Sequence, residues 1–359
     1  MAISEISRRS SIAHLVDPLH DSRWNALLES HPSSSIFHTV PWLEALRRTY
    51  GYEPIVVTMS PPGTDLSNGL VFCRIDSWLS GRRWVSLPFS DHCEPLVDDA
   101  ASLQTMLSSV EQIVRQERAL YLEIRPLRAV EASSDLFHSR HSYYFHQLDL
   151  TPDIDTLFRN CHKGSTQRKI RRAEREGLIY KDGQSESLLS DFYRLLFLTR
   201  KRHQLPPQPK RWFSNLIACF GDVLKIRVAF KGRQAVAAML TIRYKNTLVY
   251  KYGGSDARFH NLGGMHLLFW KAIQEAKQEG LGVLDFGRSD CDNTGLTTFK
   301  DRWGGTRSVL TYSRFATTSN PRPLYEQEGW KVSIAKRILS HSPDRVLHSI
   351  GDLLYKHIG

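Results

Sequence analysis

The chain has 359 residues, which corresponds to about two domains at the usual ~100–200 residues each. Hydrophobic residues make up 41% and charged residues 24%, which excludes a disordered, collagen-like or small disulfide-stabilised protein. No apolar run approaches the ~20 residues of a membrane span, and the N-terminus lacks the apolar segment of a secretion signal. Five scattered cysteines without a C-x-x-C pair predict neither a zinc site nor a disulfide framework, so we expect a cytoplasmic protein.

Charge is divided unevenly along the chain. Residues 1–150 contain 13 Arg, no Lys and 18 acidic residues, a net charge of −5. Residues 151–359 contain 35 basic and 19 acidic residues, a net charge of +16. The change of sign predicts two units with different roles. We place the boundary near residue 150, because a strand-like run ends there and Thr151-Pro152-Asp153 is a helix-start signal.

The first half shows the patterns of a mixed α/β unit. Apolar spacing predicts helices over residues 17–30, 42–50 and 101–118, and Pro41 is suited to the first turn of the second helix. Period-two alternation and turn residues predict strands near 54–59, 68–76, 83–87, 120–124 and 144–150.

The second half begins with helices and continues with a strand meander. Helices are predicted over 153–160, 165–176 and 186–203, with another ending near 219 after a proline-rich break. Alternating strands over 224–230, 236–242 and 248–252 are joined by short turns. Gly263-Gly264 then leads into a helix that ends near Glu279, and a strand covers 283–286.

This order of antiparallel strands, glycines, helix and strand resembles the core of GNAT acyltransferases, and both halves show a version of it. The predicted fold class is therefore α/β (α+β), with two tandem GNAT-like domains, each a mixed and largely antiparallel sheet flanked by helices. The expected domains are residues 1–150 and 151–318, followed by a basic amphipathic helical tail over 319–359. We expect the tail to pack on the body of the protein, and attachment to an anionic membrane surface is the alternative.

The most distinctive local motif runs from Leu284 to Gly305. Arg288 and Ser289 follow the end of a predicted strand, and ligands of open α/β sheets bind at that edge. Phe299, Lys300 and Trp303 then fall on a short helix. A lysine there would hold a phosphate or neutralise the oxyanion of an acyl transfer, and an aromatic ring would stack on a base or sugar. The alternative is that the rings belong to the core and the lysine is a solvated surface charge.

This segment resembles the end of the second domain in the Fem family of peptidoglycan bridge-forming aminoacyltransferases, in particular the Fem-related proteins of exosortase and exopolysaccharide systems. Phe37-His-Thr-Val-Pro-Trp42 and Gly51-Tyr-Glu-Pro54 resemble the opening of the family, and the resemblance covers most of residues 35–315. It implies transfer of an acyl group onto an amine, from acetyl-CoA or another acyl-CoA, or from an aminoacyl-tRNA. In aminoacyl-transferring members a Phe-Lys pair contacts the 3′ end of the donor and stabilises the oxyanion, and the matching residues here are Phe299 and Lys300.

The resemblance also implies basic residues that hold the diphosphate of a nucleotide-linked or lipid-linked acceptor. The candidates are Arg47 or Arg48, and Lys163, Arg168 or Arg171. From Arg159 to Lys181 the chain has 8 basic and 2 acidic residues, a net charge of +6. Such a surface suits tRNA, a nucleotide diphosphate or a polyanionic glycan, and a solvated helix face is the alternative.

Two further segments are candidates for the site. Gly263-Gly264 at a helix start resembles the diphosphate loop of CoA-binding acetyltransferases, although the R/Q-x-x-G-x-G/A pattern is absent, and a tight turn is the alternative. The loop from Pro88 to Pro95 gathers polar side chains, of which Asp91 or Glu94 would accept a proton from the attacking amine. A loop that only forms turns and caps is the alternative, and we predict no metal site.

The leading hypothesis is an acyltransferase that acts on an amine of a cell-envelope or exopolysaccharide precursor. We expect it in the cytoplasm or on the inner face of the cytoplasmic membrane, with an anionic donor or acceptor such as CoA, tRNA or a nucleotide-linked or lipid-linked sugar, and without stable DNA binding. The alternative hypothesis is a non-catalytic GNAT-fold protein that binds nucleic acid or serves as a scaffold.

Overall fold

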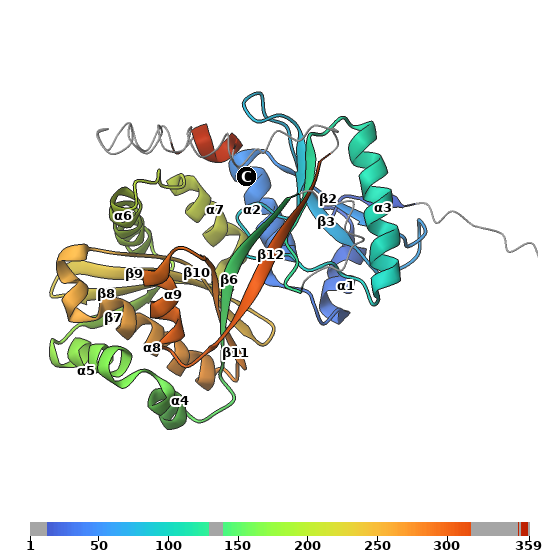
Figure 1. Ribbon diagram of the computed structural model, residues 1–359. Coiled ribbons are helices and arrows are strands. Elements are labelled where there is room, and N and C mark those ends of the chain that lie inside the picture. Colours follow the sequence, from blue (N-terminus) through green and yellow to red (C-terminus); the bar gives the residue numbers. More distant parts are fainter. Residues whose placement is uncertain (1–12, 129–138, 317–350, 352, 358–359) are drawn as a thin grey trace, which may run out of the picture.

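The computed structural model describes residues 13–128, 139–316, 351 and 353–357 (Figure 1). The described strands form one twelve-stranded sheet in the order β1-β2-β3-β4-β5-β12-β6-β11-β10-β9-β8-β7. The strands are β1 (His14–Val16), β2 (Glu53–Thr58), β3 (Leu70–Ile75), β4 (Arg83–Val85), β5 (Tyr121–Ile124), β6 (Ser139–Asp149), β7 (Ile179–Gly183), β8 (Leu224–Lys231), β9 (Gln234–Tyr244), β10 (Thr247–Ser255), β11 (Val283–Asp290) and β12 (Thr306–Ala316).

The centre of the sheet is built from two long strands that come from different halves of the chain. β6 closes the first half, yet it pairs antiparallel with β11 of the second half. β12 follows the last helix of the second half and lies between β5 and β6, antiparallel to both. Figure 1 shows β6 and β12 side by side where the two halves meet. The halves therefore exchange a central strand, and the sheet is continuous through the molecule.

Each half contains a pair of parallel strands connected by a helix. In the first half, β4 and β5 are joined through α3 (Ala100–Gln116), and in the second, β10 and β11 are joined through α8 (Gly264–Gln278). The second pair is hydrogen-bonded only from Thr247 to Val249 and from Val283 to Asp285. Beyond these residues β10 continues along β9 while β11 continues along β6. The two strands therefore diverge beyond Val249 and Asp285.

Helices cover both faces of the sheet because its strands alternate apolar side chains between them. On β9, Ala238 and Leu240 belong to one core, whereas Ala237 and Met239 belong to another. The first core contains α1 (Ser22–Ser30), α2 (Val40–Tyr50), α6 (Glu186–Arg202) and α7 (Lys210–Phe220), and it spans both halves. On the opposite face α3 covers the first half, and α4 (Ile154–Asn160), α5 (Arg168–Arg175) and α8 cover the second.

Several short helical segments complete the described structure. They are η1 (Ile36–His38), the π-helical turn η2 (Lys163–Gln167), η3 (Gly221–Val223), η4 (Ala257–Leu262) and the helix α9 (Thr294–Asp301).

The predicted strands and the helices predicted before residue 317 are confirmed, with ends shifted by a few residues. Three strands were not predicted, namely β1, β7 and β12. β12 was not predicted because Arg, Ser and Thr make up most of its sequence. Its buried apolar side chains are Leu310, Tyr312 and Phe315. Residue 150 falls directly after β6, and the division into domains of residues 1–150 and 151–318 stays a prediction.

Most of the tail over 319–359 lies outside the described residues. Residues 353–357 are helical and contact both halves. The Tyr52 hydroxyl donates to the main-chain oxygen of Tyr355 at 2.7 Å, and the Tyr355 hydroxyl donates to the main-chain oxygen of Pro206 at 3.1 Å. The described end of the chain therefore packs on the body of the protein. Across the described part, no helix combines the length and apolar character that crossing a membrane requires.

Candidate active site

The loop that follows β4, residues 86–95, carries polar side chains of the first half to the diverging strands of the second. Leu87 and Phe89 have φ angles of 56° and 62°, a strained conformation for residues with side chains. Arg125 Nη1 donates to the Leu87 main-chain oxygen at 3.0 Å. The Tyr312 hydroxyl of β12 donates to the Asp91 main-chain oxygen at 2.6 Å. These bonds from β12 and the end of β5 hold the strained loop in place.

Asp91 of this loop forms a buried ion pair with Lys251 of β10. Asp91 Oδ2 and Lys251 Nζ are 2.8 Å apart, and both side chains are almost entirely buried. The ammonium also lies over the rings of Phe37 and Trp42, at 5.4 and 6.0 Å from their centroids. Burial by itself would raise the pKa of Asp91, but Lys251 and Arg288 together hold it below its ordinary value. Asp91 is therefore an ionised carboxylate whose charge is already paired.

Gly287 of β11 lies between this loop and α9. Its φ is 69°, and a Cβ atom there would lie 3.0 Å from Asp91 Oδ2. Lys300 Nζ of α9 donates to the main-chain oxygens of Gly287 and Arg288, both at 2.9 Å. Glycine is required at position 287 by its left-handed conformation and by the close approach of the Asp91 carboxylate.

Lys300 is buried rather than solvated. Its exposed fraction is 2%, and the described contacts engage two of the three N–H bonds of its ammonium. Burial lowers the pKa of Lys300 to about 8, although Asp91 and Asp285 act in the opposite direction. The Asn293 side chain caps the start of α9 by accepting from the main-chain N–H of Leu296 at 3.1 Å, and Lys300 lies in the last turn of this helix. The helix therefore presents a buried cation to β11.

His92, the next residue of the loop, faces Asp285 of β11. Its Nε2 lies 3.4 Å from Asp285 Oδ2, and Asp285 Oδ1 accepts from the Gly287 main-chain N–H at 2.6 Å. The rings of Phe37 and Phe145 pack edge-on against the imidazole, at 5.3 and 5.4 Å between centroids. The other ring nitrogen, Nδ1, is buried and has no hydrogen-bond partner among the described residues. One histidine of the first half thus meets one carboxylate of the second.

Glu94 is engaged elsewhere in the same loop. Its Oε2 accepts from the main-chain N–H groups of Leu127 and Arg128. Its main-chain oxygen lies 2.9 Å from His38 Nε2. The side chain therefore ties the loop to the segment after β5, which is the turn-and-cap role foreseen as the alternative for this loop.

Arg288 and Ser289 follow Gly287 on β11. The Arg288 guanidinium stacks on Tyr143 at 4.0 Å and lies over Tyr312 at 5.1 Å, and its Nε is 4.0 Å from Asp91 Oδ1. The Ser289 hydroxyl is buried without a hydrogen-bond partner in the described part of the chain. Arg288 therefore lies next to Asp91, and the role of both residues in binding stays a prediction.

The two aromatic residues of the motif differ in exposure. Trp303 is fully buried and packs against Phe269 and Phe286, at 5.5 and 6.4 Å between centroids. Phe299 is partly exposed and lies beside His266, at 5.2 Å. Trp303 therefore has the core packing foreseen as the alternative, while Phe299 keeps a surface that a ligand can reach.

The glycine pair at the start of α8 is packed against neighbouring elements. A Cβ atom on Gly263 would lie 2.4 Å from the main-chain oxygen of Lys169 in α5, and one on Gly264 would lie 2.9 Å from the Ala237 Cβ of β9. Gly263 also has a φ of 82°. Close packing therefore accounts for both glycines, which matches the tight-turn alternative.

The predicted anion-binding residues lie in two separate parts of the molecule. Lys163 and Arg168 are exposed around the start of α5, and Arg171 lies over the Phe158 ring at 5.4 Å. Arg47 and Arg48 of α2 both pair with Glu44, at 2.8 and 2.7 Å. α2 and α5 lie well apart in Figure 1, so these groups do not form one site.

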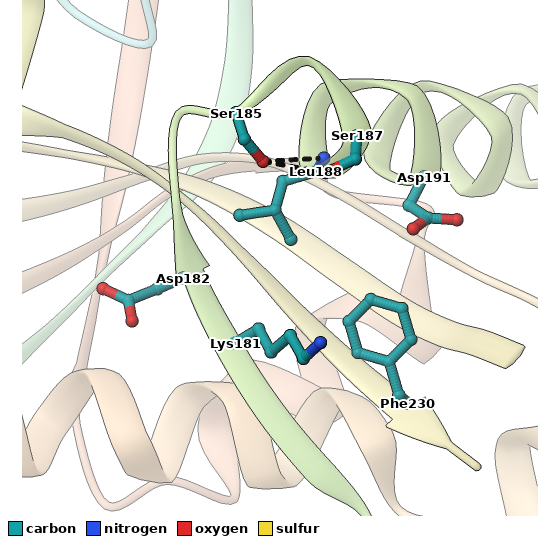
Figure 2. Close-up of a pocket in the computed structure, with 7 residues that line it drawn as sticks. All are labelled: Lys181, Asp182, Ser185, Ser187, Leu188, Asp191 and Phe230. Atoms are coloured by element: carbon teal, nitrogen blue, oxygen red, sulfur yellow. Dashed lines mark hydrogen bonds between the residues drawn. The ribbon is translucent and has the colours of Figure 1, made fainter. Parts of the chain in front are cut away.

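A hollow of about 580 Å³ lies at the other end of the sheet, between the edge strand β7, β8 and the start of α6. Figure 2 shows that Ser185 caps α6 at its rim, where its hydroxyl accepts from the Leu188 main-chain N–H. No predicted site residue lines it, and the lining residues are Lys181, Asp182, Ser185, Ser187, Leu188, Asp191 and Phe230.

Sequence reasoning missed two members of the charged cluster, Lys251 and Asp285. Asp285 interrupts the apolar run Leu284-Asp-Phe286. A carboxylate within an apolar strand is rarely buried without a partner, and this feature could have identified Asp285 as a site residue. Lys251 stands between Tyr250 and Tyr252, which is the solvent-facing position of an alternating strand. Nothing local distinguishes it from a surface lysine. Within residues 13–128 and 139–316, no group of three or more His, Cys, Asp or Glu side chains is arranged to hold a metal ion.

Comparisons with known proteins bear on the fold and the reaction class. Residues 161–301 match the family model of the acetyltransferase (GNAT) domain. The UDP-N-acetylmuramoylpentapeptide-lysine N(6)-alanyltransferase of Weissella viridescens is 29% identical over 111 residues, which cover 30% of this chain and 33% of that protein. The match therefore spans about a third of the length of this curated relative.

Solved structures show the same fold. FemX superposes with a TM-score of 0.65 at 15% identity, over 88% of this chain and 99% of that one. A tandem GNAT protein from the clavulanic acid biosynthesis pathway superposes with a TM-score of 0.53 at 10% identity, over 86% and 99% of the two chains. The predicted α/β fold of GNAT type and the resemblance to the Fem proteins are therefore confirmed.

Proposed function

We propose that this chain is an N-acyltransferase that moves an aminoacyl group onto an amine of a cell-envelope precursor. The GNAT match over residues 161–301 and the named activity of the alanyltransferase relative support the reaction class. One observation carries the proposal: the buried ammonium of Lys300 lies against Gly287, beside the diverging strands β10 and β11. A preorganised cation in a buried site is suited to stabilising the oxyanion of an acyl transfer.

The reaction needs positioning and charge stabilisation rather than covalent catalysis. A neutral amine attacks the carbonyl carbon of the donor, and the carbonyl electron pair moves onto oxygen. Collapse of this intermediate breaks the bond to the leaving group. Lys300 can offer its third N–H bond to the oxyanion, since the other two are held by Gly287 and Arg288.

An aminoacyl-tRNA suits the site better than an acyl-CoA. Packing against Lys169 and Ala237 explains the Gly263–Gly264 pair without a diphosphate. α5 packs on the same face of the sheet as α8, where Phe299 is also packed. The exposed basic residues Lys163 and Arg168 therefore share a face with the motif that carries Lys300, and such a surface suits a polyanion.

The proposed acceptor is based on the match to the alanyltransferase. The alanyltransferase relative is named for the lysine of UDP-N-acetylmuramoylpentapeptide, so this lysine is the first acceptor to test. An amine on an exopolysaccharide precursor is the second. Contact of the tail with a membrane stays a prediction.

The test measures transfer by the purified chain from labelled alanyl-tRNA and from labelled acetyl-CoA, with the muramoyl pentapeptide as acceptor. We expect transfer from alanyl-tRNA and a ~10²–10³-fold loss of kcat in Lys300→Ala, the size of losing one oxyanion donor. Lys277→Ala is the matched control, because the Lys277 ammonium contacts the exposed Thr151 main-chain oxygen. Transfer from acetyl-CoA alone would make the chain an acetyltransferase and contradict the proposed donor.

The second candidate is a non-catalytic protein that binds nucleic acid, and the basic second half of the chain favours it. This hypothesis predicts steeply salt-dependent RNA binding and no product with either donor. That result with folded protein would overturn the enzymatic proposal.

A further inference from the structure

We propose that His92 is the general base that removes the proton of the attacking amine, and that Asp285 of the opposite half holds it in place. This inference rests on the proposed acyl transfer and adds a catalytic residue to it. The pair is formed only when the loop after β4 reaches β11, so neither half contains it alone.

The geometry is that of an imidazole oriented by a carboxylate. His92 Nε2 faces Asp285 Oδ2 at 3.4 Å, which favours the tautomer with hydrogen on Nε2. Nδ1 then carries the lone pair, and this buried atom has no hydrogen-bond partner in the described part of the structure. A base whose far nitrogen is held by a third group is a recurring arrangement in acyl-transfer enzymes.

The two carboxylates of the same loop are poorer bases. Asp91 is paired with Lys251 at 2.8 Å, and this charge pairing keeps its pKa below the ordinary value. Glu94 accepts two main-chain N–H groups of the segment after β5. Removing a proton from an amine with either one would require breaking these contacts.

The position of the pair relative to Lys300 supports the assignment. Asp285 is the last residue of β11 that pairs with β10, opposite Val249. Gly287, two residues further on, donates its N–H to Asp285 and accepts from Lys300 through its carbonyl oxygen. One residue therefore connects the carboxylate behind the base to the cation that stabilises the oxyanion.

The proton balance of the step is complete without a further reactant. The amine nitrogen forms a bond to the carbonyl carbon, and its proton passes to His92 Nδ1. The carbon–oxygen bond to the 3′ hydroxyl of the donor then breaks, and the imidazolium returns the proton to the leaving oxygen. His92 ends neutral, as it began.

His92→Gln is the decisive variant, because a glutamine amide keeps a donor toward Asp285 but cannot act as a base. We expect kcat to fall ~10²–10⁴-fold with KM little changed.

His146→Gln is the matched control. His146 Nε2 lies 3.1 Å from Asp301, and its Nδ1 is also buried without a described partner. Asp301 also pairs with Arg307 at 3.3 Å and is partly exposed, on the α9 side of the sheet. We expect this variant to keep the wild-type kcat and KM.

A second variant keeps the proposal testable if His92→Gln does not fold, which thermal unfolding would show. Asp285→Asn removes the carboxylate that faces His92 Nε2, so kcat should fall while KM changes little. A wild-type kcat in either folded variant would overturn the assignment of His92 as the base and leave the proposed function standing. Absence of transfer by the wild type would overturn the proposed function and this assignment together.

Discussion

Asp91 and Lys251 form a buried ion pair at 2.8 Å although 160 positions separate them in the chain. The pair joins the loop after β4 to the diverging strand β10. Removing one partner leaves the other as an uncompensated buried charge, which is far more costly than losing an exposed pair.

Lys251→Met should therefore destabilise the protein by about 3–5 kcal/mol, measured as the free energy of unfolding in urea. The double variant Asp91→Asn/Lys251→Met should recover a large part of this loss. Lys210→Met is the control, because the exposed Lys210–Glu186 pair should contribute at most about 1 kcal/mol. Equal effects of the two single lysine variants would contradict the role given to burial.

The pH dependence of kcat should show whether the charge of Lys300 is needed for turnover. Burial lowers the pKa of its ammonium from 10.5 to about 8, and the cation is the form that stabilises the oxyanion. We expect kcat to fall as pH rises through about 8. Lys300→Arg stays charged over this range, so its lower kcat should not show the falling limb. A falling limb that persists in Lys300→Arg would assign it to another group.

Acid should destabilise the protein through Glu123. Burial alone would raise its pKa, but Arg125 and Arg314, at 2.7 and 2.5 Å, lower it from 4.5 to about 2. Because the folded-state pKa is the lower one, this stabilisation is present above pH 4.5 and is lost as pH falls toward 2. The loss corresponds to about 3 kcal/mol.

Measuring the free energy of unfolding between pH 6 and 2.5 tests this. Glu123→Gln should lack this part of the acid dependence, while Glu111→Gln, which alters the more exposed pair with Arg115, should keep it. Identical pH slopes for wild type and Glu123→Gln would remove Glu123 from the acid response.

The exchanged strand predicts how fragments behave. Residues 1–150 contain β5 and β6 but not β12, which lies between them. Expressed alone, this fragment should unfold without cooperativity, and expressed with residues 151–359 it should form a complex that copurifies. Circular dichroism and copurification measure both outcomes. A fragment 1–150 that unfolds cooperatively on its own would show instead that the first half is an independent domain.

The end of the chain should stabilise the interface between the halves. Tyr355 donates to Pro206 and packs on Phe89 at 5.7 Å between centroids. Tyr355→Ala should lower the free energy of unfolding by about 1–3 kcal/mol, since it removes a ring contact and a hydrogen bond. Leu353→Ala, at a side chain that is 56% exposed, should change it by less than about 0.5 kcal/mol. Equal melting temperatures for the two variants would contradict the docking of this segment.

Local patterns predicted much of the fold. The spacing of Met106, Val110 and Val114 indicated α3, and the alternation from Leu224 to Tyr252 indicated the meander of β8, β9 and β10. The motif around Lys300 directed attention to the right part of β11 and α9. These features depend on residues that are close to one another in the chain, so their periodicity can be read from a single sequence.

The sequence by itself determined the α/β class, the helices, the meander and the Lys300 motif, because periodicity and capping act over a few residues. Only the tertiary structure decided that β12 lies between β5 and β6, and that Asp91 and His92 reach Lys251 and Asp285. These contacts join residues more than a hundred positions apart. No local pattern encodes such contacts, because a buried lysine and a surface lysine read alike until the partner is in place.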